Sequence, residues 1–159
     1  MWNAVSYFEN LSAKLLVAKG IYKFCRVSGL NHLEDVLANM MKYNAFLAVD
    51  DSDDGVTINR GSGYFNRRAV VVYVLKKYKS TDMLSRETAL YECRGIHKSL
   101  LTKLIKDSNE VPELQFLDKS RIPYHELPGM FAAGTTGLYF IITIEEPVNL
   151  VYNAAEWES

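Results

Sequence analysis

The pattern of apolar and polar positions is clearest between residues 67 and 108. Positions 69–75 read AVVVYVL, an unbroken apolar run that is rich in valine and tyrosine. Such a run is typical of a strand that is covered on both faces of its sheet. Basic residues flank it on both sides. The pattern therefore predicts a central strand over residues 67–79.

A long amphipathic helix is predicted directly after this strand. Apolar residues recur at steps of three and four from Met83 to about Lys106, and polar residues fill the opposite face. Asp82 precedes the run, where a carboxylate caps free amides and favours the positive end of the helix dipole. A helix of this length extends about 36 Å, enough to cross a sheet. We expect Leu100 and Leu104 to face that sheet.

Two shorter helices are predicted in the N-terminal part of the chain. Apolar residues at steps of four and three predict a helix over residues 3–19, ended by the glycine that follows. Residues 21–27 fit either a short strand or further helix. Asn31 and Glu34 resemble a capping box, and the apolar period beyond them predicts a second helix to residue 42.

The remaining strands are shorter. We predict a hairpin that turns at Asp54–Gly55 and, after the long helix, an edge segment interrupted by proline and a strongly apolar strand stopped by Pro147. These shorter predicted strands cover 45–49, 56–58, 114–117, 121–127, 138–144 and 148–152. Segregated runs of helices and strands predict a single α+β domain over 1–159, with an antiparallel or mixed sheet and the long helix on one face. Residues 1–43 would form its N-terminal helical part, and 44–159 the sheet and long helix.

Composition narrows the function classes. The chain has 159 residues with 18 Lys and Arg against 19 Asp and Glu, a formal charge of −1. This balance gives no electrostatic footprint for nucleic acid, so we expect no specific binding to DNA or RNA. We also expect no signal peptide and no membrane span. Cys25 and Cys93 are far apart, which favours free thiols in a reducing cytoplasm.

Two stretches carry partial metal-site patterns. Asp50, Ser52, Asp54 and Gly55 match places of a calcium loop, but its twelfth place holds Gly61 instead of a bidentate glutamate. We therefore favour a solvated hairpin turn there.

Cys93 and His97 are one helical turn apart and could share a metal, yet a core cysteine and a half-buried histidine explain the pair better. Gly61–Gly63 precedes a strand instead of a helix, so it is a plain loop and no phosphate cradle. The sequence carries no recognisable catalytic motif, and we expect no cofactor, no metal and no enzymatic activity.

Basic residues at the ends of the central strand are candidate contacts for phosphate groups. A solvated strand end that protects a sheet edge is the favoured alternative. The candidate basic contacts are Arg67, Arg68, Lys76, Lys77 and Lys79.

Three pieces of the chain together resemble the tail-terminator and neck (head–tail joining) proteins of long-tailed bacteriophages. They are residues 43–51 (YNAFLAVDD), the strand and helix at 67–107, and residues 136–147 (TGLYFIITIEEP). The resemblance implies a small α+β subunit, without catalytic residues, that forms a ring with other copies. Such rings are commonly hexameric; they cap the tail tube or join it to the head, and DNA passes through them.

By this resemblance the protein is a structural protein of the virion, assembled in the bacterial host cytoplasm, with tail-tube or neck (connector) proteins as partners. Two alternatives stay open. The first is a small cytoplasmic enzyme or ligand-binding α+β domain with a pocket between helix and sheet. The second is a nucleic-acid-binding accessory protein that uses the basic strand ends.

The segment 128–137 (PGMFAAGTTG) is predicted to be a long mobile loop. It places two large apolar residues among glycines, which suits contact with a neighbouring subunit better than exposure to solvent. The alternative is that these residues fold back onto the chain's own core. The candidate subunit interface comprises Met130, Phe131, Ala132, Ala133, Thr135 and Thr136.

Overall fold

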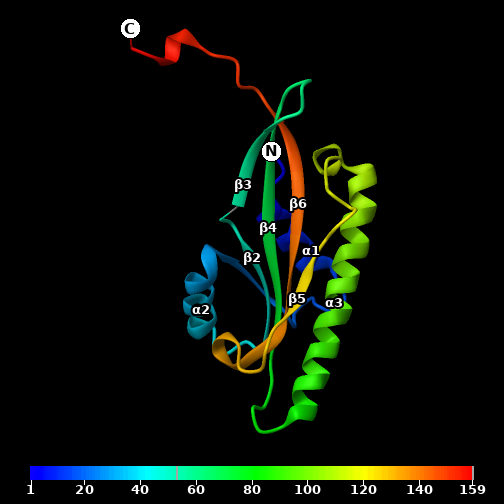
Figure 1. The fold of residues 1–159 in the computed structure, drawn as a ribbon. Helices are drawn as coiled ribbons and strands as arrows, with labels where there is room; N and C mark the ends of the chain where they lie inside the picture. The colour runs from blue at the N-terminus through cyan, green and yellow to red at the C-terminus, as the bar shows by residue number, and fades with distance from the viewer. Residues whose placement is uncertain (53, 159) are drawn as a thin grey trace.

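Two fourteen-residue strands, β4 (Tyr64–Lys77) and β6 (Thr135–Val148), form the centre of the fold (Figure 1). They pair antiparallel along their whole length, from Tyr64 with Val148 to Lys77 with Thr135. Strands of this length extend about 45 Å and define the long axis of the molecule. The computed structural model describes residues 1–52 and 54–158.

Four shorter strands complete a six-stranded mixed sheet. Its order is β1-β2-β4-β6-β5, and β3 pairs with β4 beyond the end of β2. The strands β1 and β2 run parallel and are connected through α2, whereas the other pairs are antiparallel. The bounds are β1 Lys23–Val27, β2 Ala45–Asp50, β3 Asp54–Asn59 and β5 Tyr124–Glu126. The predicted α+β class with a mixed sheet is confirmed.

Helices cover the two faces of the sheet unequally. The helices α1 (Ala4–Lys14) and α3 (Met83–Glu110) pack on one face, and α2 (Gly29–Asn39) packs on the other. Alternate residues of β4 therefore enter different cores. Val70, Val72 and Val74 lie in the core under α1 and α3, and Tyr73 and Leu75 lie in the core under α2. This double burial explains the unbroken apolar run.

The long helix forms as its sequence predicts. The Asp82 side chain accepts hydrogen bonds from the amides of Leu84 at 3.0 Å and Ser85 at 3.3 Å. Leu100 and Leu104 are buried against the sheet. The expected helix face is therefore confirmed, although the helix continues to Glu110 instead of ending near residue 106.

The N-terminal part contains a strand as well as helices. Of the two possibilities for residues 21–27, the short strand is confirmed as β1, whereas the helix predicted over 3–19 was too long. The helix α1 ends at Lys14, and two turns then bury Ala18 and Tyr22 before β1 begins. The predicted capping box was also misplaced, because α2 starts at Gly29 after Ser28 and contains Asn31.

The strands β2 and β3 do not form the predicted hairpin. Both pair with the same edge of β4, β2 with residues 72–76 and β3 with residues 64–69. They therefore run in the same direction as two parts of one interrupted strand. The real hairpin joins β3 to β4 through residues 60–63, where the amide of Arg60 donates to the carbonyl of Gly63 at 2.9 Å.

The C-terminal third also differs from the prediction. Residues 112–114 form a single 3-10 turn, and only a bridge between Leu117 and Ile144 remains of the strand expected at 114–117. The strand β6 begins at Thr135 and runs through Pro147, which pairs with Phe65. Beyond it, residues 149–158 leave the sheet without forming the expected last strand. The edge strand within 121–127 is confirmed as β5.

Among the described residues, one half of the sheet has helical cover on one face only. We call it the distal half: β3, residues 64–69 of β4 and residues 143–148 of β6. The register places Val56, Arg67 and Glu145 side by side on the face that α2 covers elsewhere. No part of α2 belongs to a core cluster with these residues, and Val56 is exposed.

Replacing Gly137 with alanine should disrupt the central strand pair. Gly137 has φ +147°, and an added Cβ would lie 2.0 Å from the carbonyl oxygen of Val74 on β4. Backbone cannot yield cheaply, so we expect Gly137→Ala to cost about 2–4 kcal/mol of unfolding free energy. The matched control is Gly95→Ala in α3, where nothing lies within 4 Å of the new Cβ. It should stabilise by about 0.5–1 kcal/mol. Equal urea midpoints for the two variants would contradict this account.

Truncating the buried face of α3 should cost far more than truncating its exposed side. Leu104 is 0% exposed and Ile105, the next residue, is 42% exposed. We expect Leu104→Ala to lower the unfolding free energy by about 2–5 kcal/mol, because it leaves a cavity against the sheet. Ile105→Ala should cost less than about 1 kcal/mol. Chemical denaturation measures both, and a reversed order would show the helix to be turned on its axis.

Candidate functional surface

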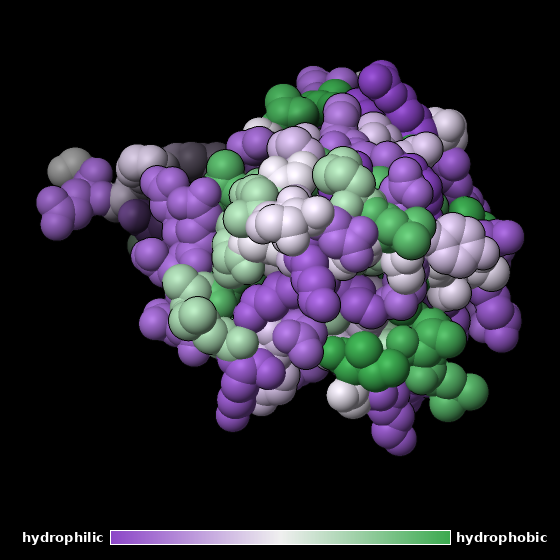
Figure 2. All heavy atoms as spheres, turned by 90° about the horizontal axis from the view of Figure 1, so that it is seen from below, coloured by the Kyte–Doolittle hydropathy of each residue, from purple (hydrophilic) through white to green (hydrophobic). Residues whose placement is uncertain are grey.

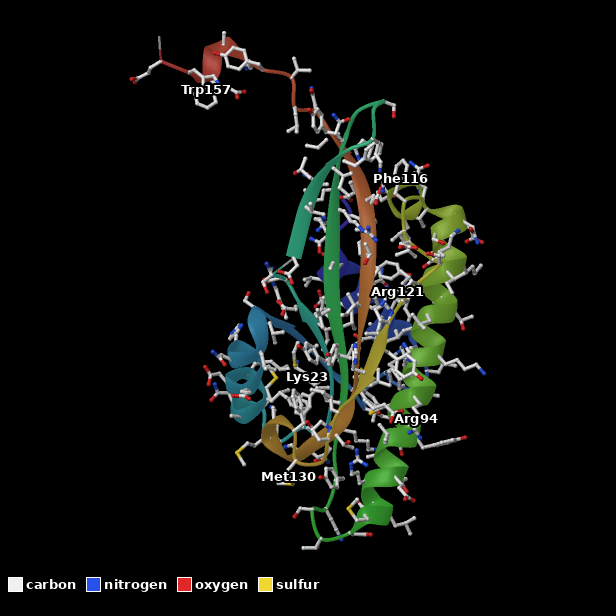
Figure 3. The ribbon with its side chains drawn as sticks, viewed as in Figure 1. Lys23, Arg94, Phe116, Arg121, Met130 and Trp157 are labelled. Carbon is white, nitrogen blue, oxygen red and sulfur yellow. The ribbon has the colours of Figure 1, made fainter. Side chains whose placement is uncertain are left out.

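A C-terminal arm, residues 149–158, projects from the distal end of the sheet (Figures 1 and 3). Its large apolar side chains are Leu150, Val151, Tyr152 and Trp157, and each is more than half exposed, Val151 to 81%. The Tyr152 and Trp157 rings stack with centroids 6.3 Å apart across a 3-10 turn at Ala154–Glu156. Among the described residues, the hydrogen bonds of the arm join arm residues only to one another.

The opposite end of the molecule carries the loop at 128–134. It is not the long mobile loop that the sequence suggested, because its last three residues belong to β6 and it is held at several points. The Met130 amide donates to the Tyr78 hydroxyl oxygen at 2.6 Å, and the Arg86 guanidinium donates to the Leu127 carbonyl at 3.0 Å. Met130 and Ala133 have φ of 58°, a backbone conformation that non-glycine residues seldom adopt.

The structure separates the candidate interface residues into three groups. Met130 and Ala133 are exposed, and Figure 3 shows Met130 at the outside of the loop. Phe131 and Ala132 are half-buried and pack against the core under α2. Thr135 and Thr136 are fully buried within β6. In the single chain, a partner can therefore reach Met130 and Ala133 but not the two threonines.

Other exposed apolar residues surround this end. Met41 follows α2, and Met83 and Leu84 begin α3; all three are exposed. Figure 2 views the molecule from this end and shows apolar side chains in separate patches among polar ones. Large apolar side chains that gather on a surface mark contact sites more often than scattered ones do.

A groove of about 720 Å³ lies between α3 and the segment that follows α1. Its apolar walls include Val17, Ile21 and Tyr91, which are all more than half exposed. Charged residues also line it: Lys76, Glu92, Arg94 and Lys98. The apolar pattern did not indicate these groove residues, because it predicted a helix over residues 15–19. The unbroken apolar run LLVA at 15–18, which no helical period requires, was the available signal.

The basic candidates do not converge on one surface. Arg67 and Arg68 lie about 30 Å along β4 from Lys76 and Lys77. Within each pair, the two neighbouring side chains point to opposite faces of the sheet. Arg67 lies 3.5 Å from Asp118, and Arg68 lies 3.1 Å from Glu146.

At the other end of β4, two of the basic residues have polar partners and the third is exposed. Lys76 pairs with Glu92, and Lys77 donates to the Met41 carbonyl at 2.8 Å. Lys79 is exposed. These ion pairs support the solvated-strand-end interpretation over a phosphate-binding site.

The partial calcium pattern has a structural explanation. Asp50 Oδ1 accepts hydrogen bonds from the Gly29 amide at 3.1 Å and from the Ser52 amide at 2.9 Å. The carboxylate thus lies at the N-terminus of α2, where the helix dipole favours negative charge. Asp54 is exposed on β3, and the chain there continues without the predicted turn; residue 53 lies outside the described part.

Cys93 and His97 are both core residues, as the favoured interpretation had it. The Cys93 sulfur lies 3.9 Å from the Tyr22 hydroxyl, and burial raises the pKa of its thiol to about 11. The His97 ring lies between Phe140 and Tyr124, and burial lowers its pKa. Both cysteines are free and buried. Within the described residues, no three His, Cys, Asp or Glu side chains gather as a metal site would require.

Serine substitutions in the loop should separate surface from core. Met130 is 61% exposed, so we expect Met130→Ser to leave the melting temperature close to that of the parent. Phe131→Ser removes a ring packed against the α2 core and should cost about 1–3 kcal/mol. Differential scanning calorimetry measures both changes. A large loss for Met130→Ser would mean that this side chain also belongs to the core.

Two further findings concern the chain as a whole. No described helix is both long and apolar enough to cross a membrane. No known family model matches the chain, and no curated protein sequence matches it. What the chain does must therefore be inferred from its own exposed residues.

Proposed function

We propose that this chain is a structural protein of a tailed-bacteriophage virion, which self-assembles into a ring at the head–tail neck or at the end of the tail tube. The observation that carries the proposal is the C-terminal arm. Its four large apolar side chains are each more than half exposed, and the stacking of Tyr152 on Trp157 leaves both rings mostly open to solvent. Exposed apolar surface of this kind is stabilised by association with another protein.

The shape of the subunit supports the same proposal. The arm leaves one end of the long axis, and Met130 with its apolar neighbours lies at the other (Figure 3). A subunit with different contact surfaces at its two ends makes head-to-tail contacts, which generate rings when the rotation closes. The α+β fold with a long helix on the sheet is also what the phage resemblance implies.

Under this proposal the protein has no enzymatic role. Its partners are other copies of itself, commonly six in a ring, and the tail-tube or neck proteins on which the ring docks. The ring assembles in the cytoplasm of the bacterial host and remains in the virion. DNA passes through it without sequence-specific contacts.

A second candidate function rests on the groove beside α3. Its volume of about 720 Å³ falls within the range of small-molecule sites. The groove lies beside α3 at the sheet, with Lys76 of β4 and the buried Tyr22 and Ile96 in its lining, so it matches in place the pocket between helix and sheet that this alternative expects. Its walls, however, are mostly exposed side chains, whereas ligand pockets usually bury most of the surface of their ligand. A saturable small ligand that raises the melting temperature of a strict monomer would favour this function over the ring.

Assembly of the purified chain tests the main proposal. We expect light scattering to show a discrete oligomer as the concentration rises to about 1 mM, and electron microscopy to show rings. Met130→Ser should weaken assembly while the melting temperature stays unchanged, because the side chain is exposed. A matched control is Leu30→Ser on α2, which exchanges an exposed apolar residue away from both ends. A chain that stays monomeric throughout this range would overturn the proposal.

A further inference from the structure

The arm is compact at its far end, where two aromatic rings stack across a 3-10 turn. The 3-10 turn at Ala154–Glu156 brings the Trp157 ring against Tyr152, so the tip is compact before it meets any partner. Trp157 is 67% exposed, and Figure 3 shows it far from the body of the molecule. Tryptophan and tyrosine are the side chains that most often anchor protein interfaces.

The groove beside α3 offers the matching apolar walls. Val17 and Ile21 line it from the segment after α1, and Tyr91 and Gly95 line it from α3. Gly95 adds no side chain, and nothing lies within 4 Å of the position a Cβ would take. The α3 wall is therefore open at this point, beside the Tyr91 ring.

The charges of arm and groove are complementary. Three of the four charged residues lining the groove are basic, Lys76, Arg94 and Lys98, and Glu92 is the only acid among them. The arm carries Glu156 and Glu158 and no basic residue. The Lys76 charge is already opposed by Glu92 and that of Arg94 by Glu126. Lys98 has no ion pair among the described residues, so it is the basic side chain open to an incoming carboxylate.

The arm cannot reach the Lys76 end of the groove in its own chain. It starts after Val148, which pairs with Tyr64, whereas Lys76 at the groove pairs with Thr136. Twelve strand residues separate Tyr64 from Lys76, a distance of about 40 Å. The nine residues from 149 to 157 span at most about 30 Å when fully extended, and the turn shortens them further. An arm that reaches the Lys76 end of the groove must therefore come from another copy.

We propose that the C-terminal arm of one copy inserts Tyr152 and Trp157 into the groove between residues 17–21 and α3 of the next copy. This inference deepens the ring proposal and rests on it, because it names the contact that joins neighbouring subunits. The contact is heterologous: each copy gives an arm at one end and receives an arm near the other. The two glutamates of the arm lie toward Lys98 and the basic rim.

Complementary variants of the full chain test this contact. The arm variant carries Val151→Ser and Trp157→Ser, and the groove variant carries Val17→Asp and Ile21→Asp. All four side chains are more than half exposed, so both variants should keep the melting temperature of the parent. Each variant alone should lose at least about tenfold in self-association affinity, because it lacks one half of every contact.

Mixing the two variants gives the decisive result. The groove variant still has an intact arm, and the arm variant still has an intact groove. We therefore expect sedimentation velocity to show one-to-one complexes that grow no further. Leu30→Asp, an exposed apolar residue on the opposite face of the sheet, is the matched control and should assemble like the parent. Mixtures that stay monomeric would overturn the inference.

A charge exchange tests the orientation of the arm. Lys98→Glu should weaken assembly, and Glu156→Lys with Glu158→Lys on the arm should restore it in the same chain. Restoration should be strongest at low salt, since exposed charges are screened. Lack of any restoration at low salt would contradict the placement of the glutamates beside Lys98.

The outcomes distinguish this inference from the proposed function. If rings form equally well from the parent, the arm variant and the groove variant, the ring proposal stands and the arm contact is wrong. If one-to-one complexes form from the mixture but the parent forms open chains and no ring, the arm contact stands and the proposed function fails. If the parent is monomeric and the mixture shows no complex, both are wrong.

Discussion

The antiparallel pairing of β4 with β6 is the interaction on which the rest of this structure depends. It joins residues 64–77 to residues 135–148 without a break and provides both faces against which the helices pack. This pairing is long-range, because α3 and β5 lie between the two strands in the sequence. The helix therefore gains its packing surface only when the two distant strands have found their register, which Gly137 permits by its close approach to Val74.

The same pairing gives the molecule two ends with different chemistry. At one end the chain leaves the sheet as an apolar arm, and at the other the loop at 128–134 is held by Tyr78 and Arg86. Rigid strands fix the distance between these ends, so contacts at one end are placed relative to contacts at the other. In the ring that we propose, the length of the strand pair would set the spacing of neighbouring contacts.

Local sequence patterns predicted the parts of the fold that local physics determines. The apolar run of β4, the Asp82 cap and the Leu100 and Leu104 face of α3 follow from burial and periodicity, and all were confirmed. The pairing partners did not follow. Nothing in residues 45–58 shows that β2 and β3 continue along one edge of β4, because strand direction depends on a neighbour distant in the sequence.

The candidate surface was predictable only in part, for a related reason. Met130 stood out because glycines and alanines surround it, whereas Thr135 and Thr136 are buried by a pairing that no local signal reveals. The groove forms because α1 ends at Lys14, and the turns that follow bury Ala18 and Tyr22. The periodicity of a sequence cannot show whether a helix or a turn is more stable when the turn is stabilised by contacts that are distant in the sequence.

The one-sided cover of the distal half has a consequence for motion. The half under α2 is closed by cores on both faces, while the described residues give the distal half a core only on the side of α1 and α3. Local unfolding starts where few buried contacts oppose it. Amide protons of β3 should therefore exchange with solvent sooner than those of β2, although both strands pair with the same β4. The segment that carries the arm would thus be the more compliant end of an otherwise stiff subunit.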